Sequence, residues 1–388
     1  MRSAEISARV RELIQRSGMS AGEFAGHVGL DAPKMSRSLS GERRFTSLNL
    51  AKIAEFSGTS VDWIMGTEQP TPALAARHDS VESTQDAGTQ AAIEKATYYA
   101  RLRGDLADLG YPQRPTDFKW QDRGRSYVTS GEKLATEAIS HLRAKGHDHT
   151  SDRGLVDLIE EAFEVDVAVE KLGGSFEGLT WRDSNCRLIV IAVSSIPGRR
   201  RFTLAHELAH LLAEDDQELT IDKAGERHPS EVMANTFAAS FLMPEDVLLE
   251  HIGDEPLDQR CFARLSCELF VTPRTLSWRL FNLRLIDDAK RRTFGAMRTM
   301  DAAVMAGQTA EFSSWIEDSL IPRVPQLLIE DSGRAYLDGK TTLRPLANLV
   351  GVDVNYLRNA LETERSEFEP DLEEEFGDVA EVGVRAVS

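Results

Sequence analysis

Residues Phe202 to Leu212 read FTLAHELAHLL, an apolar helical segment that carries His206, Glu207 and His210 within five positions. Its leucine spacing predicts a largely buried helix, in which a histidine or glutamate is costly unless a partner satisfies it. Residues four apart in a helix lie on one face, so His206 and His210 can hold one metal ion with Glu207 beside it. The alternative is a pair of histidines at the edge of a core, bonded to backbone or carboxylate groups.

A third ligand is predicted on the next helix, within SEVMANTFAASFLMP (residues 230–244). Glu231 falls in its first turn, from which an antiparallel partner helix can bring a carboxylate to the same metal. Two histidines, one carboxylate and an open fourth position are typical of a catalytic zinc site. Zinc lowers the pKa of a bound water to about 7, and Glu207 is placed to accept its proton as general base.

Some details of this site stay open at the level of sequence. The polar stretch between the two helices also offers carboxylates and His228, although its composition is more typical of a solvated loop. Arg201, Tyr127 and His228 are candidates for stabilising an oxyanion, and the sequence does not choose among them.

Composition places the chain among soluble proteins. With 388 residues it has room for two or three domains, and a charged fraction of 28% is that of a globular protein. No apolar run reaches the roughly 18 residues that span a membrane, and the first residues lack a signal-peptide core. Three cysteines are too few for a disulfide framework. We therefore expect a cytoplasmic protein.

The amino-terminal stretch SAGEFAGHVGLDAPKMSRSLSGERRF (residues 20–45) has the pattern of a helix-turn-helix. Ser20 can cap a first helix and Gly29 can supply the left-handed turn residue, with Asp31 as the cap of a second helix. The pattern resembles the XRE family of phage-repressor DNA-binding domains, and LNLAKIAEFSGTSVDWIMG resembles the last two helices of that family. One departure is Ala21, where many such repressors carry glutamine.

This resemblance implies double-stranded DNA as a partner, bound by a homodimer on a two-part site. The second helix would present Lys34, Ser36 and Arg37 to the major groove, and Arg43 and Arg44 would meet phosphates. The total charge of −18 argues against nucleic acid, but residues 1–66 hold nine Lys or Arg against seven Asp or Glu. The alternative is a helical domain whose basic residues are solvated.

The sequence RRFTLAHELAHLL followed by EVMANTFAASFLMP resembles the ImmA/IrrE metallopeptidase family, whose characterised members cut XRE-type repressors. The resemblance runs from about Gly131 to Ile286. It implies zinc on His206, His210 and Glu231, with Glu207 as general base.

The expected fold class is mainly α with a small β-sheet (α+β), with strands in residues 165–172 and 186–193. We expect a five-helix helix-turn-helix domain in residues 1–68, a flexible linker in 69–92, a zincin-like metallopeptidase core in 93–290, a helical sensor or dimerisation region in 291–361, and an acidic, disordered tail in 362–388.

Together these features predict a DNA-binding transcriptional regulator with a latent, gluzincin-like zinc endopeptidase. Its substrate would be an XRE-type repressor, an antitoxin or the chain itself, cut in a stress response. The alternative is a transcription factor whose protease-like domain is a non-catalytic sensor of a ligand or metal. A toxin or defence component that acts on a host protein is a third possibility.

Overall fold

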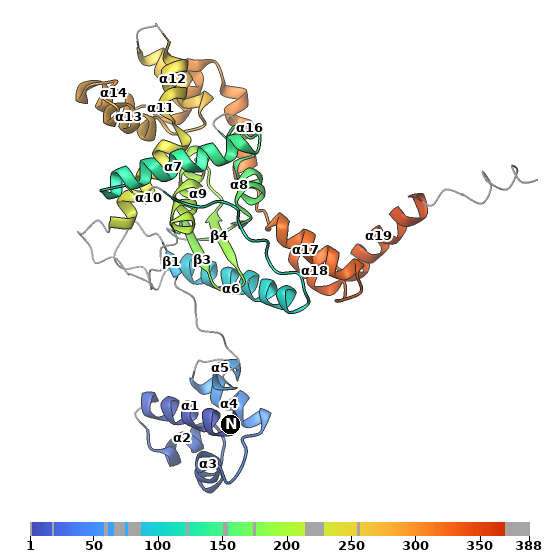
Figure 1. Ribbon diagram of the computed structural model, residues 1–388. Coiled ribbons are helices and arrows are strands. Elements are labelled where there is room, and N and C mark those ends of the chain that lie inside the picture. Colours follow the sequence, from blue (N-terminus) through green and yellow to red (C-terminus); the bar gives the residue numbers. More distant parts are fainter. Residues whose placement is uncertain are drawn as a thin grey trace, which may run out of the picture. The chain divides into compact units, whose positions relative to one another are not determined.

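The computed structural model describes residues 2–17, 19–57, 61–65, 74–76, 87–121, 124–149, 154–173, 176–213, 229–253 and 257–368. The chain separates into two compact units, Met1–Thr71 and Pro72–Ser388. Both units are dominated by helices, and the second also contains a small sheet, which confirms the expected α+β class (Figure 1). Within the described residues, no helix is both long and apolar enough to span a membrane.

The described residues of the first unit form five helices: α1 (Arg2–Ser17), α2 (Ala21–His27), α3 (Ala32–Leu39), α4 (Ser47–Ser57) and α5 (Val61–Met65). Phe24, Ile53 and Ile64 are fully buried in a core of its own. Ser20 caps α2 as expected, because its side chain accepts from the Glu23 backbone N–H and the Glu23 carboxylate accepts from the Ser20 N–H in return. Gly29 has a φ of 63°, which permits the tight turn into α3.

The sheet of the second unit has the strand order β1-β3-β4-β2. Its strands are β1 (Leu74–Ala76), β2 (Asp166–Glu170), β3 (Gly178–Arg182) and β4 (Arg187–Ala192). Strands β2 and β4 are parallel, whereas β3 pairs antiparallel with both β4 and β1. The predicted strands are thus confirmed as β2 and β4, while β1 and β3 were not expected.

The second unit contains fourteen helices among its described residues. They are α6 (Ala87–Asp108), α7 (Tyr127–Ala144), α8 (Leu155–Phe163), α9 (Pro197–Leu212), α10 (Pro229–Leu242), α11 (Glu245–Ile252), α12 (Gln259–Glu268), α13 (Pro273–Asn282), α14 (Asp288–Gly295), α15 (Thr299–Ala306), α16 (Thr309–Ser319), α17 (Gln326–Leu337), α18 (Arg344–Val350) and α19 (Val354–Phe368).

Helices cover both faces of the sheet. Alternate residues of a strand point to opposite faces, so Val167 and Ile189 join the core built by α7, α8, α9 and α10. Ala168 and Val190 join a second core with α6 and α17 on the other face. Figure 1 shows α6 along the sheet on the side opposite α7 and α9.

Two predicted boundaries differ from the structure. The segment 69–92, expected to be a flexible linker, contains β1 and the first residues of α6. Helix α19 continues to Phe368, inside the tail that was expected to be disordered from residue 362. Residues 369–388 lie outside the described part of the chain.

A buried ion cluster joins α6, β2 and α17. The side chain of Arg103 is inaccessible to solvent, and its Nε and a terminal nitrogen donate to the two carboxylate oxygens of Asp166 at 2.6 and 2.7 Å. A further guanidinium nitrogen of Arg103 bonds to Asp331. Burial raises the pKa of Asp166 in spite of Arg103, so the carboxylate depends on this cation to stay ionised.

We predict that Arg103→Met lowers the free energy of unfolding by about 3–5 kcal/mol, because two buried carboxylates lose their shared cation. Urea unfolding followed by tryptophan fluorescence measures this, since four of the five tryptophans lie in the second unit. The control is Arg101→Met, an exposed position on the same helix, which should change stability little. Equal midpoints for the two variants would contradict the assigned role of the cluster.

Candidate metal centre

Helix α9 brings the predicted metal ligands into a buried environment. It packs against β3, β4 and α10, and Pro197 in its first turn has no N–H to satisfy. His206 and Glu207 are at most 1% exposed, and His210 is 7% exposed. Glu231 lies in the first turn of α10, as expected, and its side chain is 31% exposed.

The three predicted ligands form a small triangle. Nε2 of His206 lies 3.1 Å from Nε2 of His210, and the Glu231 carboxylate oxygens lie 3.3 and 3.2 Å from these two nitrogens. Zinc bonds of about 2.0–2.1 Å in a tetrahedron place neighbouring ligands about 3.3 Å apart. The donor set and its spacing therefore fit one zinc ion, with a fourth position for water or substrate.

The same three residues form the only metal-compatible cluster of His, Cys, Asp and Glu among the described residues. Burial raises the pKa of the Glu231 carboxyl, but hydrogen bonds from the two histidine rings and their charge outweigh burial, so its pKa is strongly lowered. A carboxylate that stays ionised beside two imidazoles is what binding of a divalent cation requires.

Glu207 is held by strand β3. The hydroxyl of Thr180 donates to Oε2 of Glu207 at 2.8 Å, and it also lies 3.1 Å from the Glu207 backbone oxygen. A Cβ at Gly178 would lie 2.9 Å from Oε1 of Glu207, so glycine at this position leaves room for the carboxylate. Thr180 orients one carboxylate oxygen, and Gly178 makes space for the other.

We did not predict a role for Thr180 from the sequence, because we did not predict strand β3. The signal was present in GLTWRDSNCRLIVIA, where Asp183, Ser184 and Asn185 separate two segments rich in β-formers. The Asp183 carboxylate accepts hydrogen bonds from the backbone N–H groups of Asn185 and Cys186, which shapes the hairpin turn.

Two of the three candidate oxyanion residues, Arg201 and Tyr127, lie within the described part of the chain. Arg201 is buried, donates to the backbone oxygen of His149 and stacks on Phe270. Tyr127 is 54% exposed at the start of α7. His228 lies outside the described residues.

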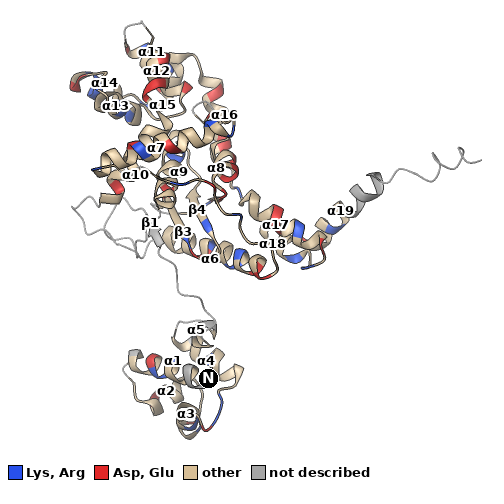
Figure 2. Cartoon of the chain, in the orientation of Figure 1, with Lys and Arg blue, Asp and Glu red and all other residues tan. Residues whose placement is uncertain are grey.

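The predicted DNA-contacting residues lie in the first unit. Lys34, Ser36 and Arg37 are exposed on α3, and Lys34 pairs with Asp31 at 3.1 Å. Arg44 is exposed after α3, while Arg43 is half-buried. Figure 2 shows the basic residues of α3 and of the segment that follows it in blue.

Comparison with known proteins relates the region that contains the candidate ligands to a peptidase family. Residues 161–269 match the family model Peptidase_M78, described as the IrrE N-terminal-like domain. The match includes His206, Glu207, His210 and Glu231. The chain is 42% identical over 85 residues to the radiation response metalloprotease IrrE of Deinococcus radiodurans. The region is therefore similar to the metallopeptidase domain of IrrE, and this similarity supports a metal cofactor.

The likeness to this relative is confined to one region. The alignment covers 19% of this chain and 26% of the Deinococcus protein, so the chain spans about a quarter of the length of the curated relative. Among solved structures, Bacillus thuringiensis PlcR bound to a peptide and DNA aligns with 94% of this chain and 98% of that chain, at 11% identity. Its TM-score is 0.16, a value at which the alignment carries no argument.

We predict about one zinc ion per chain, measured by elemental mass spectrometry on protein that has met no chelator. Replacing His210 or Glu231 with alanine should remove most of this zinc, because each supplies one of three ligands. Glu245→Ala, an exposed glutamate at the start of α11, is the matched control and should keep the metal. Full zinc in the Glu231→Ala protein would exclude this residue as the third ligand.

Proposed function

We propose that the chain is a DNA-binding transcriptional regulator whose metallopeptidase domain is a latent zinc endopeptidase that cuts the chain's own linker. The observation that supports this proposal most is the pairing of β1 with β3. Strand β1 lies at the start of the second unit, within the segment 69–92 that was predicted as a linker, and Ala75 is in register with Thr180, the residue that orients Glu207. The linker backbone thus runs along the strand that borders the candidate general base.

Proteases commonly bind peptides as an added strand, because backbone hydrogen bonds hold any extended sequence in register. Without β1, strand β3 would be the free edge of the sheet. A peptide from solution would have to displace β1 to use this edge. The pairing of β1 with β3 would therefore keep other peptides away from the site, which is the proposed latency. The segment that contains β1 would itself be the substrate. A second repressor-type protein is the alternative substrate, and it would need the edge to be vacated.

The chemistry follows from the side chains around the metal ligands. Zinc, when bound, would lower the pKa of a water and polarise the peptide carbonyl. Glu207 would accept the proton of the attacking water and pass it to the leaving amine. Thr180 would keep the Glu207 carboxylate turned toward the reaction, and burial of Glu207 would strengthen its interaction with the proton that it carries.

The first unit supports the regulatory half of the proposal. It has a core of its own, α2 and α3 are joined by a tight turn at Gly29, and α3 exposes Lys34 and Arg37. A second helix that projects basic side chains is the arrangement by which a helix-turn-helix reads the major groove. Cutting the linker would separate this unit from the rest of the chain and weaken any DNA binding that depends on dimerisation through the second unit.

We predict that incubation of the zinc-loaded protein produces fragments by a cut between residues 67 and 90, and that Glu207→Gln produces none while keeping its zinc. Intact-mass spectrometry locates the bond. Because glutamine cannot accept the proton, the expected loss of rate is at least about 100-fold. If Glu207→Gln were cut at the same rate, the fragments would come from a contaminating protease and not from the chain itself. Regulation that survives in Glu207→Gln would favour the sensor function.

We predict that Arg37→Ala weakens binding to a random-sequence duplex of about 30 base pairs and reduces the slope of log affinity against log salt by about one, since the DNA-facing surface loses one positive charge. Fluorescence anisotropy over a salt series measures both quantities. Lys52→Ala, which removes an equal charge from an exposed position on α4, is the control. Identical slopes for Arg37→Ala and the unchanged protein would contradict DNA contact through α3.

A further inference from the structure

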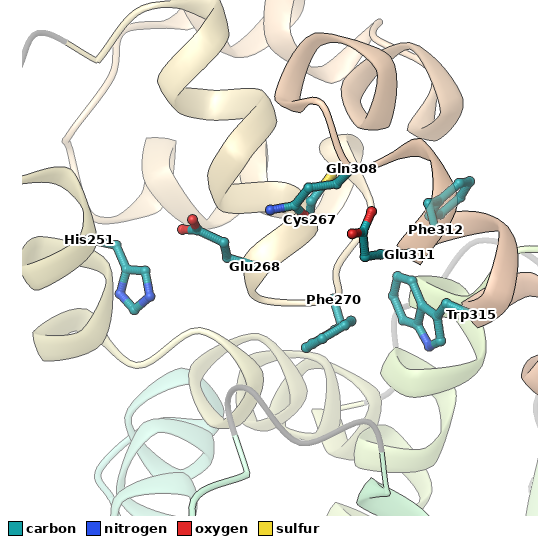
Figure 3. A pocket seen from close by; sticks show the side chains of 8 residues that line it. All are labelled: His251, Cys267, Glu268, Phe270, Gln308, Glu311, Phe312 and Trp315. Carbon is teal, nitrogen blue, oxygen red and sulfur yellow. The ribbon is translucent and has the colours of Figure 1, made fainter.

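A cavity lies where α11, α12 and α16 meet, and none of the candidate metal ligands lines it. Its volume is about 390 Å³, within the usual range for small-ligand sites. Eight side chains line it: His251, Cys267, Glu268, Phe270, Gln308, Glu311, Phe312 and Trp315. In the view of Figure 3, Gln308 and Glu311 lie above the rings of Phe270 and Trp315.

The lining combines aromatic rings with carboxylates. The Phe270 and Trp315 rings meet edge to face with centroids 5.0 Å apart, and Phe312 contacts Trp315 in the same way at 6.0 Å. Glu311 has no ion-pair partner among the described residues, and Glu268 has only Arg264 at 3.9 Å, the limit of ion-pair distance. Aromatic faces and carboxylates together attract an organic cation, which the rings desolvate and the carboxylates neutralise.

Other ligand classes fit this lining less well. An anion would meet two carboxylates. A metal ion would need converging donors, but within the described residues only the α9 and α10 ligands form such a cluster. Burial and the nearby Glu268 raise the pKa of the Cys267 thiol to about 11, so this sulfur is no thiolate ligand at neutral pH. A neutral apolar molecule would leave the carboxylates without a counter-charge.

The cavity also borders the helix that carries the metal ligands. The guanidinium carbon of Arg201 on α9 lies 5.6 Å from the centre of the Phe270 ring. The backbone of Val271 and Thr272 packs so closely on Gly198 that a Cβ there would lie 2.9 Å from the Thr272 nitrogen. On the other wall, Ser319 at the end of α16 accepts a hydrogen bond from Arg200 at 3.0 Å. Phe270 and the segments that follow both walls of the cavity therefore contact the first turns of α9.

Phe270 is the wall residue with the most constrained backbone. It follows α12 with a φ of 53°, in the left-handed region where glycine is usual after a helix. The Val271 N–H bonds to the Ser266 oxygen and the Phe270 N–H to the Cys267 oxygen, which fixes this helix end. If a bound ligand displaced the Phe270 ring, we expect Arg201 to move as well, because Arg201 contacts this ring and the backbone after α12 is fixed.

We propose that this cavity binds a small organic cation, such as a quaternary ammonium or guanidinium compound, and that binding alters the first turns of α9. The site would give the peptidase domain an effector input distinct from its substrate groove. This regulatory meaning rests on the proposed peptidase function, but the binding itself does not.

Calorimetric titration of the full-length Glu207→Gln protein tests binding without any contribution from proteolysis. The probes are choline, its neutral carbon analogue 3,3-dimethylbutan-1-ol, and agmatine. We expect saturable binding of choline or agmatine at one site, and choline affinity about tenfold above that of the neutral analogue, as for a desolvated cation on aromatic rings. Absence of saturable binding for both cations, or equal affinity for choline and its neutral analogue, would overturn the proposal.

Glu311→Gln, added to the same protein, should weaken binding of the cation about tenfold, because an exposed carboxylate of the lining loses its charge. Glu317→Gln, also exposed on α16 but outside the lining, should leave affinity unchanged. Equal affinities for these two variants would remove the cavity as the binding site.

Hydrogen exchange tests the link to α9. The bound cation should slow amide exchange in residues 197–201 as well as in α12 and α16. Protection limited to α12 and α16 would retain the binding site and overturn its effect on α9. A protein that binds the cation but never cuts its linker would refute the proposed function and not this site.

Discussion

Two imidazole nitrogens, Nε2 of His206 and Nε2 of His210, lie 3.1 Å apart inside a helix that is almost wholly buried. The carboxylate of Glu231 on a second helix lies 3.3 and 3.2 Å from the same two nitrogens. The packing of α9 against α10 thus brings together three groups at the spacing that one divalent metal ion can bridge.

The sheet places the rest of the site around this triangle. Strand β3 packs against α9 so closely that Gly178 must lack a side chain, and Thr180 then reaches the Glu207 carboxylate. The strand on the far side of β3 is β1, which lies at the start of the second unit. Strand β3 therefore holds the Glu207 carboxylate through Thr180 and also pairs with β1.

Much of the site could be predicted from the sequence, because residues on one face of a helix recur every three or four positions. The four-residue interval of His206 and His210 and the position of Glu231 in the opening turn of an apolar helix were enough to predict the cluster. The strand that orients Glu207 was harder to predict, because β3 is short and all of its residues except Arg182 are buried, so GLTWR shows no alternation of polar and apolar residues. The pairing of Leu74–Ala76 was beyond sequence reasoning, since nothing local in a segment rich in Pro, Ser and Thr specifies a partner strand far along the chain.

The cavity lined by Phe270, Glu311 and Trp315 could not be predicted from the sequence for a related reason. Phe270 and Glu311 are far apart in sequence and line one cavity only through the packing of α12 against α15 and of α15 against α16. Phe270 occupies a position where helices favour glycine, and Trp315 reads as an ordinary core residue of an amphipathic helix. Only their position around a shared cavity distinguishes them from structural side chains.

X-ray absorption at the zinc edge of the zinc-loaded protein tests whether His206, His210 and Glu231 bind the metal. We predict nitrogen and oxygen neighbours at about 2.0–2.1 Å, outer-shell scattering from two imidazole rings and no sulfur. Sulfur at about 2.3 Å, or an oxygen-only shell without imidazole, would show that the metal is held elsewhere and would contradict the assignment of His206, His210 and Glu231 as its ligands.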